Sequence, residues 1–319
     1  MRIIRVIAIA IFICLWLWAG LLLTAWPGAP AVLGWLLTPA WLGFGALAWR
    51  RRRDAGTPEV AGALMCAVFF SYSLIHPQQR RDWAPDQAIQ ASGTVEDGVL
   101  IVRGVRHCDA EGTAWETRAY PLADCRGVDL FIVPFGGIRG PAHVMVSFDF
   151  GDGEWLCVSI EARREVDEQY GAWTGMLRHF ELIYIFGDER DVVARRLLID
   201  RDPVWRYPLN ASPDQARALL LDMVNRANLL AVQPEFYHSL ANSCASNLRD
   251  HGDAILPAPI GHDWRVWLPG YAESLVAEHG LISAGARLGD FTDAEVLDAS
   301  WSQRLRAQEV DDAGRGTDE

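Results

Sequence analysis

The chain has 319 residues, a formal net charge of −12 and a sequence pI near 5.1. An acidic surface repels the phosphate backbone, so the composition argues against a nucleic-acid-binding protein. The length is enough for one or two domains, and apolar residues are most concentrated at the N-terminal end.

Three apolar runs open the chain, over residues 3–26, 31–49 and 60–76. A bilayer core needs about 20 apolar residues per helix, so the runs predict three transmembrane helices in a membrane anchor over residues 1–77. The arginines at 50–53 follow the second run. The positive-inside rule places them in the cytoplasm and, if the third run spans, the rest of the chain in the periplasm. The protein is then expected to be embedded in the bacterial inner membrane.

Two other interpretations of these runs stay open. The first run has the length of a secretory signal peptide, although no small-residue cleavage site follows it. The third run is short, and it also fits a buried helix of a soluble domain.

Cys108 and Cys125 bracket a predicted strand and turn. A disulfide between them and two free thiols are equally compatible with that spacing.

A soluble α+β domain is predicted over residues 78–300, followed by an acidic tail over 301–319 that is expected to be disordered. The β-prone segments are residues 99–105, 115–120, 129–133, 181–186 and 204–207. The clearest helix begins after Ser212, which forms a capping box with Gln215. Pro213 stands at the first helical position. Further helices are expected near residues 242–252 and 271–279.

A hairpin is predicted around His143, with Gly151-Asp152-Gly153 as its turn. A three-residue loop makes the pairs Phe150–Glu154, Phe148–Leu156, Val146–Val158 and Val144–Ile160, which keep one face apolar apart from Glu154 beside the turn. The same register places His143 directly opposite Glu161. A carboxylate beside an imidazole fixes its tautomer and stabilises its charged form, so Glu161 is predicted to orient His143 as a general base. The alternative is a strand histidine with an ordinary hydrogen bond.

Cys244 is predicted to be the second residue of a helix that Asn242 caps. A helix N-terminus lowers the pKa of a thiol, and a nearby imidazolium lowers it further. The free amides there are also suited to stabilising an oxyanion. The thiol is therefore predicted to be a nucleophile, although a buried structural cysteine is the alternative. Cys157 on a strand is a rival thiol, and His238 is a rival base.

Eight segments carry a family resemblance: residues 81–83, 102–106, 142–150, 159–165, 180–184, 188–191, 234–237 and 242–244. Together they resemble the family of Lnb N-terminal periplasmic domains, named after the lipoprotein intramolecular transacylase, over about residues 80–282. The resemblance implies a circularly permuted papain-like domain of NlpC type, with an antiparallel sheet and a Cys-bearing helix. It assigns His143 as base and Cys244 as nucleophile. Ser243 and Ala245 depart from the family's usual Asn and Thr beside the cysteine.

The sequence therefore predicts a catalytic set of Cys244, His143 and Glu161. The residues expected to support them or to bind substrate are Asn242, Ser243, Arg163, Ser159 and Asn247. The predicted function is a membrane-anchored periplasmic Cys–His acyltransferase or thiol hydrolase that acts on lipid or lipoprotein acyl groups through an acyl-Cys intermediate. No cofactor or metal is expected. A peptidoglycan amidase or endopeptidase and a non-catalytic periplasmic binding or scaffold module remain as alternatives.

Overall fold

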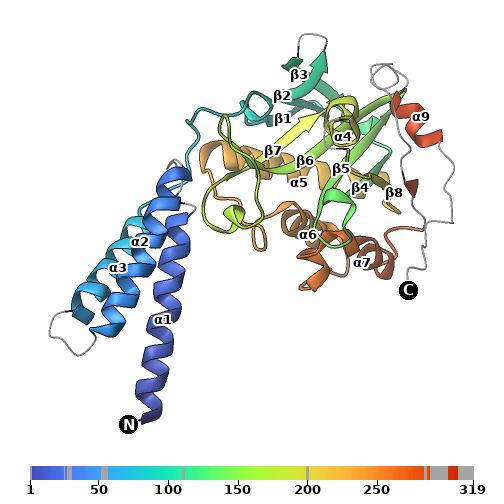
Figure 1. The fold of residues 1–319 in the computed structure, drawn as a ribbon. Helices are drawn as coiled ribbons and strands as arrows, with labels where there is room; N and C mark the ends of the chain where they lie inside the picture. Colours follow the sequence, from blue (N-terminus) through green and yellow to red (C-terminus); the bar gives the residue numbers. More distant parts are fainter. Residues whose placement is uncertain are drawn as a thin grey trace. The chain divides into compact units, whose positions relative to one another are not determined.

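The protein consists of two compact units in a computed structural model (Figure 1). The structure describes residues 2–24, 26, 31–51, 57–109, 112–198, 201–283, 286–287 and 301–307. One unit comprises Met1–Gln78 with Tyr170–Phe180, and the other comprises Gln79–Gln169 with Glu181–Glu319. The first unit is helical, and the second is an α+β domain.

The helical unit contains α1 (Arg2–Thr24), α2 (Ala31–Arg50) and α3 (Thr57–Ser73), which pack side by side (Figure 1). Trp16 of α1 stacks on Trp41 of α2 with ring centroids 4.0 Å apart. The Trp41 indole N–H donates to the Trp16 carbonyl at 2.9 Å. Gly45 permits this approach, because a Cβ atom there would lie 2.3 Å from the Trp16 indole nitrogen. Aromatic packing at a glycine thus joins the first two helices.

The prediction of transmembrane helices is wrong. Among the described residues, no helix combines the length and the apolar character that a membrane crossing requires. A span needs about 20 predominantly apolar residues. The helix α3 has 17 residues and carries Glu59 in its first turn, and α2 contains Pro39. The apolar runs formed helices near the expected positions, but a count of apolar residues did not establish a span.

The second unit is built on one mixed sheet. Its strands are β1 (Ser92–Glu96), β2 (Val99–Asp109), β3 (Gly112–Pro121), β4 (Gly127–Pro134), β5 (Ala142–Gly151), β6 (Glu154–Arg163), β7 (Glu181–Gly187), β8 (Trp205–Pro208) and β9 (Ala286–Arg287). Their order is β1-β2-β7-β6-β5-β4-β8-β9, with β3 paired to β2. The β2–β7 pair is parallel and the other pairs are antiparallel. The expectation of an antiparallel sheet is therefore corrected to a mixed one.

Helices cover both faces of this sheet (Figure 1). They are α4 (Glu189–Leu198), α5 (Pro213–Val232), α6 (Cys244–Ile255), α7 (Ala272–Glu278) and α9 (Trp301–Ala307). Short 3₁₀ turns are η1 (Pro85–Gln87), η2 (Leu122–Asp124), η3 (Phe135–Gly137), η4 (Thr174–Met176), η5 (Trp264–Val266) and η6 (Pro269–Tyr271), of which η4 belongs to the helical unit. Ile183 and Ile185 of β7 pack with α4, whereas Tyr184 between them reaches α6. Because successive strand side chains alternate, α4 and α6 lie on opposite faces.

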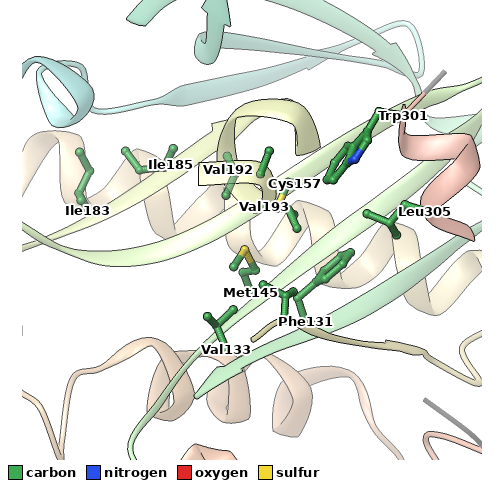
Figure 2. Packing of buried hydrophobic residues seen from close by; sticks show 12 residues of the cluster. Phe131, Val133, Met145, Cys157, Ile183, Ile185, Val192, Val193, Trp301 and Leu305 are labelled. Carbon is green, nitrogen blue, oxygen red and sulfur yellow. The ribbon is translucent and has the colours of Figure 1, made fainter. Parts of the chain in front are cut away.

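The core on the α4 face is closed by α9 (Figure 2). Trp301 and Leu305 of α9 are fully buried beside Phe131, Met145 and Cys157. This helix lies within the segment that was expected to be disordered. Trp301 and Leu305 lie one turn apart and pack against the core of the sheet, which the acidic composition of the tail did not predict. Residues 308–319 of the predicted tail lie outside the described residues.

The register predicted for the β5–β6 hairpin is confirmed from Met145 to Phe148, and the ladder ends before the predicted Val144–Ile160 pair. Phe148 pairs with Leu156 and Val146 with Val158. The turn differs from the prediction, because a bulge places Gly151 rather than Phe150 opposite Glu154. Gly151 has φ +77°, a conformation in the left-handed region that glycine adopts at low cost. The residue that the prediction placed in the loop is instead accommodated by the bulge, so the pairs further from the turn keep the predicted register.

Candidate functional site

His143 and Glu161 are joined through the hydroxyl of Ser159. The hydroxyl lies 2.7 Å from His143 Nε2 and donates to Glu161 Oε1 at 2.9 Å. An ionised carboxylate only accepts hydrogen bonds, so the single Ser159 proton points to Glu161. His143 Nε2 must then carry a proton and donate to Ser159, which leaves the lone pair on Nδ1. The predicted direct contact between His143 and Glu161 is replaced by this bridge.

Glu161 is held by groups from three other elements. Gln87 of η1 donates to Oε2 at 2.8 Å, and Arg196 of α4 donates to Oε1 at 3.2 Å. Arg106 of β2 adds a second positive charge nearby. Burial alone would raise the pKa of Glu161, but Arg196 and Arg106 hold it well below its ordinary range. The carboxylate is therefore ionised, and its charge is shared among several partners.

His143 is neutral in the resting protein. The side chain is buried, and burial together with the positive charge of Arg196 lowers its pKa to about 3, against the opposing charge of Glu161. The carboxylate that was expected to favour the imidazolium is largely offset by the guanidinium groups around it. The bridge through Ser159 consequently fixes the tautomer of His143 without making it cationic.

Cys244 is the first residue of α6, one position earlier in the helix than predicted. Ser243, not Asn242, is the N-cap and forms a capping box with Ser246. The ladder between β5 and β6 ends at Met145 and Ser159, and the amide of Val144 just beyond it hydrogen-bonds the Cys244 thiol. The thiol thus lies at the backbone of the residue that follows His143.

The thiol is protonated at rest, contrary to the expectation from the helix N-terminus. Cys244 is buried, and burial raises its pKa. Hydrogen bonds from the amides of Val144 and Ala245 and the charge of Arg196 lower it, but they offset only part of the rise. The resting protein therefore contains a neutral thiol and a neutral imidazole, and not a thiolate–imidazolium pair.

Three of the predicted supporting residues are committed to the scaffold. Asn242 donates to the Phe236 carbonyl at 2.9 Å, and Asn247 donates to the Ser243 carbonyl at 2.9 Å. Arg163 donates to the carbonyls of Gln87 and Ala88 and lies over the ring of Trp83 at 4.2 Å. These side chains hold the Cys244 turn and the segment that carries Gln87. Of the supporting set, Ser159 contacts His143 itself.

The rival residues have other roles. Cys157 is fully buried in the apolar cluster of Figure 2, and burial raises its pKa well above the ordinary value. His238 Nδ1 accepts from the amides of Leu240 and Ala241, which makes it part of a turn. Cys125 is a free, buried thiol, and the side chain of Cys108 lies outside the described residues.

Sequence reasoning missed Arg196 and Gln87. Arg196 lies near the end of a helix whose last turn is basic, a pattern that is also typical of a favourable helix dipole. Gln87 lies in a short 3₁₀ turn and is almost fully buried. Neither position carries a local motif.

The family model for the Lnb N-terminal periplasmic domain matches residues 111–270, about half of the chain. The chain belongs to this family. The matched region contains His143, Ser159, Glu161, Arg196 and Cys244, whereas Gln87 lies before it.

Membership implies a periplasmic location, as the description of the family states. The predicted anchoring in the inner membrane is not shown by the family match or by the described helices. Neither the curated proteins nor the solved structures yield a match to the chain. The circularly permuted papain-like fold that the resemblance implied is not confirmed.

Proposed function

We propose that this domain is a periplasmic cysteine-dependent acyltransferase or hydrolase that forms an acyl-Cys244 intermediate. The observation that carries the proposal is the position of the thiol. It accepts a hydrogen bond from the amide of Val144, the residue that follows His143 in the chain, and the Nε2–H of His143 is fixed by Ser159 and Glu161. A thiol, a base and a group that orients the base are the parts that nucleophilic catalysis requires.

The proposed reaction has two balanced steps. The Cys244 sulfur attacks an acyl carbonyl while its proton moves to His143 Nδ1. The bond to the leaving alcohol or amine then breaks, and His143 returns the proton to that group. An amine, hydroxyl or water next attacks the acyl-Cys244, gives its proton to His143, and the thiol is restored. The amides of Cys244 and Ala245, which hydrogen-bond the sulfur, are suited to stabilising the oxyanion.

The neutral resting pair makes activation depend on the substrate. Proton transfer from the thiol creates an imidazolium in a buried site, which the ionised Glu161 stabilises through Ser159. A substrate carbonyl presented to the helix N-terminus accepts the negative charge as the sulfur attacks, so the proton transfer is coupled to formation of the C–S bond. We therefore expect little thiolate before the acyl donor binds. The resemblance to the lipoprotein transacylase family supports a lipid or lipoprotein as that donor.

The decisive experiment is to trap the intermediate. The full chain is incubated with a diacylated lipopeptide or a phospholipid, quenched in acid, and analysed by intact and peptide mass spectrometry. We expect a hydroxylamine-sensitive acyl group on the peptide that contains Cys244. The adduct should be lost in Cys244→Ala and reduced in His143→Asn. Cys125→Ala is the matched control, because it removes another free buried thiol of the same unit.

The same resting state favours one alternative. A buried neutral thiol and a buried neutral imidazole are also what a non-catalytic binding module would contain. Absence of any adduct with both donors, together with unchanged lipopeptide binding in Cys244→Ala, would support that alternative. An adduct on Cys244 that turns over when an amine acceptor is added would support the acyltransferase.

A further inference from the structure

A second buried histidine lies on the helix that carries Cys244. His251 is seven residues further along α6, and its Nδ1 lies 2.7 Å from Asp222 Oδ2 of α5. Its Nε2 lies 2.8 Å from the hydroxyl of Tyr184 on β7. The Tyr184 hydroxyl also donates to Asn247 Oδ1 at 3.2 Å. A continuous chain of hydrogen bonds thus runs from Asp222 to Asn247.

The chain continues to the turn that holds the thiol. Asn247 Nδ2 donates to the Ser243 carbonyl and to Asn242 Oδ1, each at 2.9 Å. Asn242 Nδ2 in turn donates to the Phe236 carbonyl. A carbonyl oxygen only accepts, so both amide groups have a fixed orientation, and Asn247 Oδ1 must face Tyr184 as an acceptor. The Asn242-Ser243-Cys244 turn is therefore connected to His251 through defined donors and acceptors.

Counting protons shows that this chain has two states. Tyr184 has one hydroxyl proton. If that proton points to Asn247, His251 must donate to Tyr184 through Nε2 and to Asp222 through Nδ1, so the imidazole is cationic. If His251 is neutral and keeps its Nδ1 proton for Asp222, Tyr184 must turn its proton to Nε2. Asn247 Oδ1 then loses its donor. One proton on His251 thus decides whether the Asn247 contact is complete.

The charged groups around His251 belong to both helices that pack there. Asp222 and Arg226 project from α5, and Asp250 lies on α6. Burial is the largest influence and lowers the pKa of His251, as does Arg226 to a smaller extent, whereas Asp222 and, more weakly, Asp250 raise it. Arg226 also donates to the Tyr184 hydroxyl oxygen, which leaves room for one further donor there. The Asp222 side chain is 43% exposed, so protons exchange with water at this end of the chain.

We propose that Asp222, His251 and Tyr184 are positioning residues that brace the Cys244 turn through Asn247, and that protonation of His251 switches this brace on. The proposal rests on the proposed function in that the braced turn carries the nucleophile and the oxyanion amides. In the braced state Asn247 donates to the Ser243 carbonyl and to the Asn242 side chain, and its own Oδ1 accepts from Tyr184. In the neutral state Asn247 lacks the Tyr184 donor, and the turn is less constrained.

The test measures hydrogen exchange at the turn without any acyl donor. The amides of Ser246 and Asn247, which bond to Ser243, are followed in the full chain from pH 5 to 8 and corrected for the intrinsic pH dependence of exchange. Protonation of His251 is followed in parallel by the ¹⁵N chemical shifts of its ring. We expect protection of these amides to fall about fivefold as His251 loses its proton, as the loss of one hydrogen bond predicts.

Three variants decide the outcome. In Tyr184→Phe, His251 still titrates beside Asp222, but the step in protection should disappear. In Asp222→Asn, both the titration and the step should move together to lower pH, because the carboxylate that favours the cation is gone. Tyr120→Phe removes another buried tyrosine hydroxyl and should keep the wild-type step.

A step that survives in Tyr184→Phe, or that stays in place in Asp222→Asn, would overturn the brace. So would a His251 titration with no change in protection. Because no acyl donor is used, the result is independent of adduct formation on Cys244. Failure of the brace and failure of the proposed reaction are therefore distinguishable.

Discussion

His143 and His251 are both buried on the sheet domain, and each faces a carboxylate, but the two carboxylates act differently. Glu161 reaches His143 through Ser159 and is paired with Arg196. Asp222 contacts His251 directly and is 43% exposed at its side chain. Burial is the main cause of the lowered pKa at both histidines. The carboxylate is the second-largest influence at His251, whereas at His143 Arg196 outweighs it.

The difference shows that a carboxylate near an imidazole is not sufficient evidence for an imidazolium. Glu161 has its charge offset by two arginines, so its main effect on His143 is to fix the tautomer. Asp222 makes no hydrogen bond to an arginine among the described residues. It raises the pKa of His251, which offsets part of the lowering by burial. The partners of the carboxylate decide which role it has.

The largest expected effect is the loss of stability in acid that His143 causes. Its pKa is about 3 in the folded protein and near the ordinary 6.5 in the unfolded chain. Between these values the unfolded chain binds more protons, so stability is complete above pH 6.5 and falls as the pH is lowered. From pH 8 to 4.5 we expect this group to cost about 2.7 kcal/mol.

Chemical denaturation at several pH values measures this effect as a difference between wild type and His143→Asn. The variant should lose the His143 contribution and have a flatter stability profile over that window. His251→Asn is the comparison at the other site, and it should flatten the profile less because Asp222 favours its cation. If the pH dependence of stability flattens equally in both variants, then Asp222 does not favour the His251 cation more than Glu161 favours that of His143, contrary to the prediction.

Removing the bridge is the next largest change. Ser159→Ala leaves the His143 Nε2–H without its acceptor and takes one donor from Glu161. The residue is fully buried, so we expect a loss of about 2 kcal/mol in the free energy of unfolding. Ring ¹⁵N shifts should also show that His143 no longer prefers the Nε2–H tautomer. Ser147→Ala removes a buried hydroxyl of β5 on the same face of the sheet, which donates to Glu189, and should leave that tautomer unchanged.

Much of the hairpin and helix structure could be predicted because its signals are local. The alternation of apolar residues determined the β5–β6 register, and the Ser212–Gln215 capping box was confirmed. The start of α6 was displaced by one residue because Asn242 and Ser243 are both good caps. The contact between Ser243 and Ser246 decides between them.

The electrostatics of the site could not be predicted in the same way. Arg196 lies on α4, which is separated from the Glu161 strand β6 by the strand β7. No pattern in the sequence pairs Arg196 with Glu161. Ser159 lies two residues before Glu161, so strand periodicity placed both on one face. It did not indicate which of the two would contact His143. The charge state of the site depends on these contacts, and the resting pair is therefore neutral where local signals predicted an ion pair.

Removing Arg196 should make the influences on the pKa of His143 more like those on the pKa of His251. In Arg196→Gln, the positive charge that opposes His143 protonation is lost, and the pKa of His143 should rise by about one pH unit. The pKa of Cys244 should rise as well, because Arg196 lowers it in the wild type. Ring ¹⁵N titration and alkylation of the thiol measure the two shifts. Arg195→Gln is the matched control on α4, since Arg195 pairs with Asp86 at 3.6 Å.

The smallest expected effect separates a neutral pair from an ion pair. Alkylation of Cys244 by iodoacetamide should follow a pKa above the ~8.5 of an ordinary thiol. His143→Asn should change the rate at pH 7.5 by less than about threefold, because a neutral imidazole contributes no charge to the thiolate. Arg196→Gln should slow the reaction more than His143→Asn does. A tenfold or larger loss in His143→Asn would instead show that the imidazolium already forms at rest, and that Glu161 outweighs burial and Arg196 at His143.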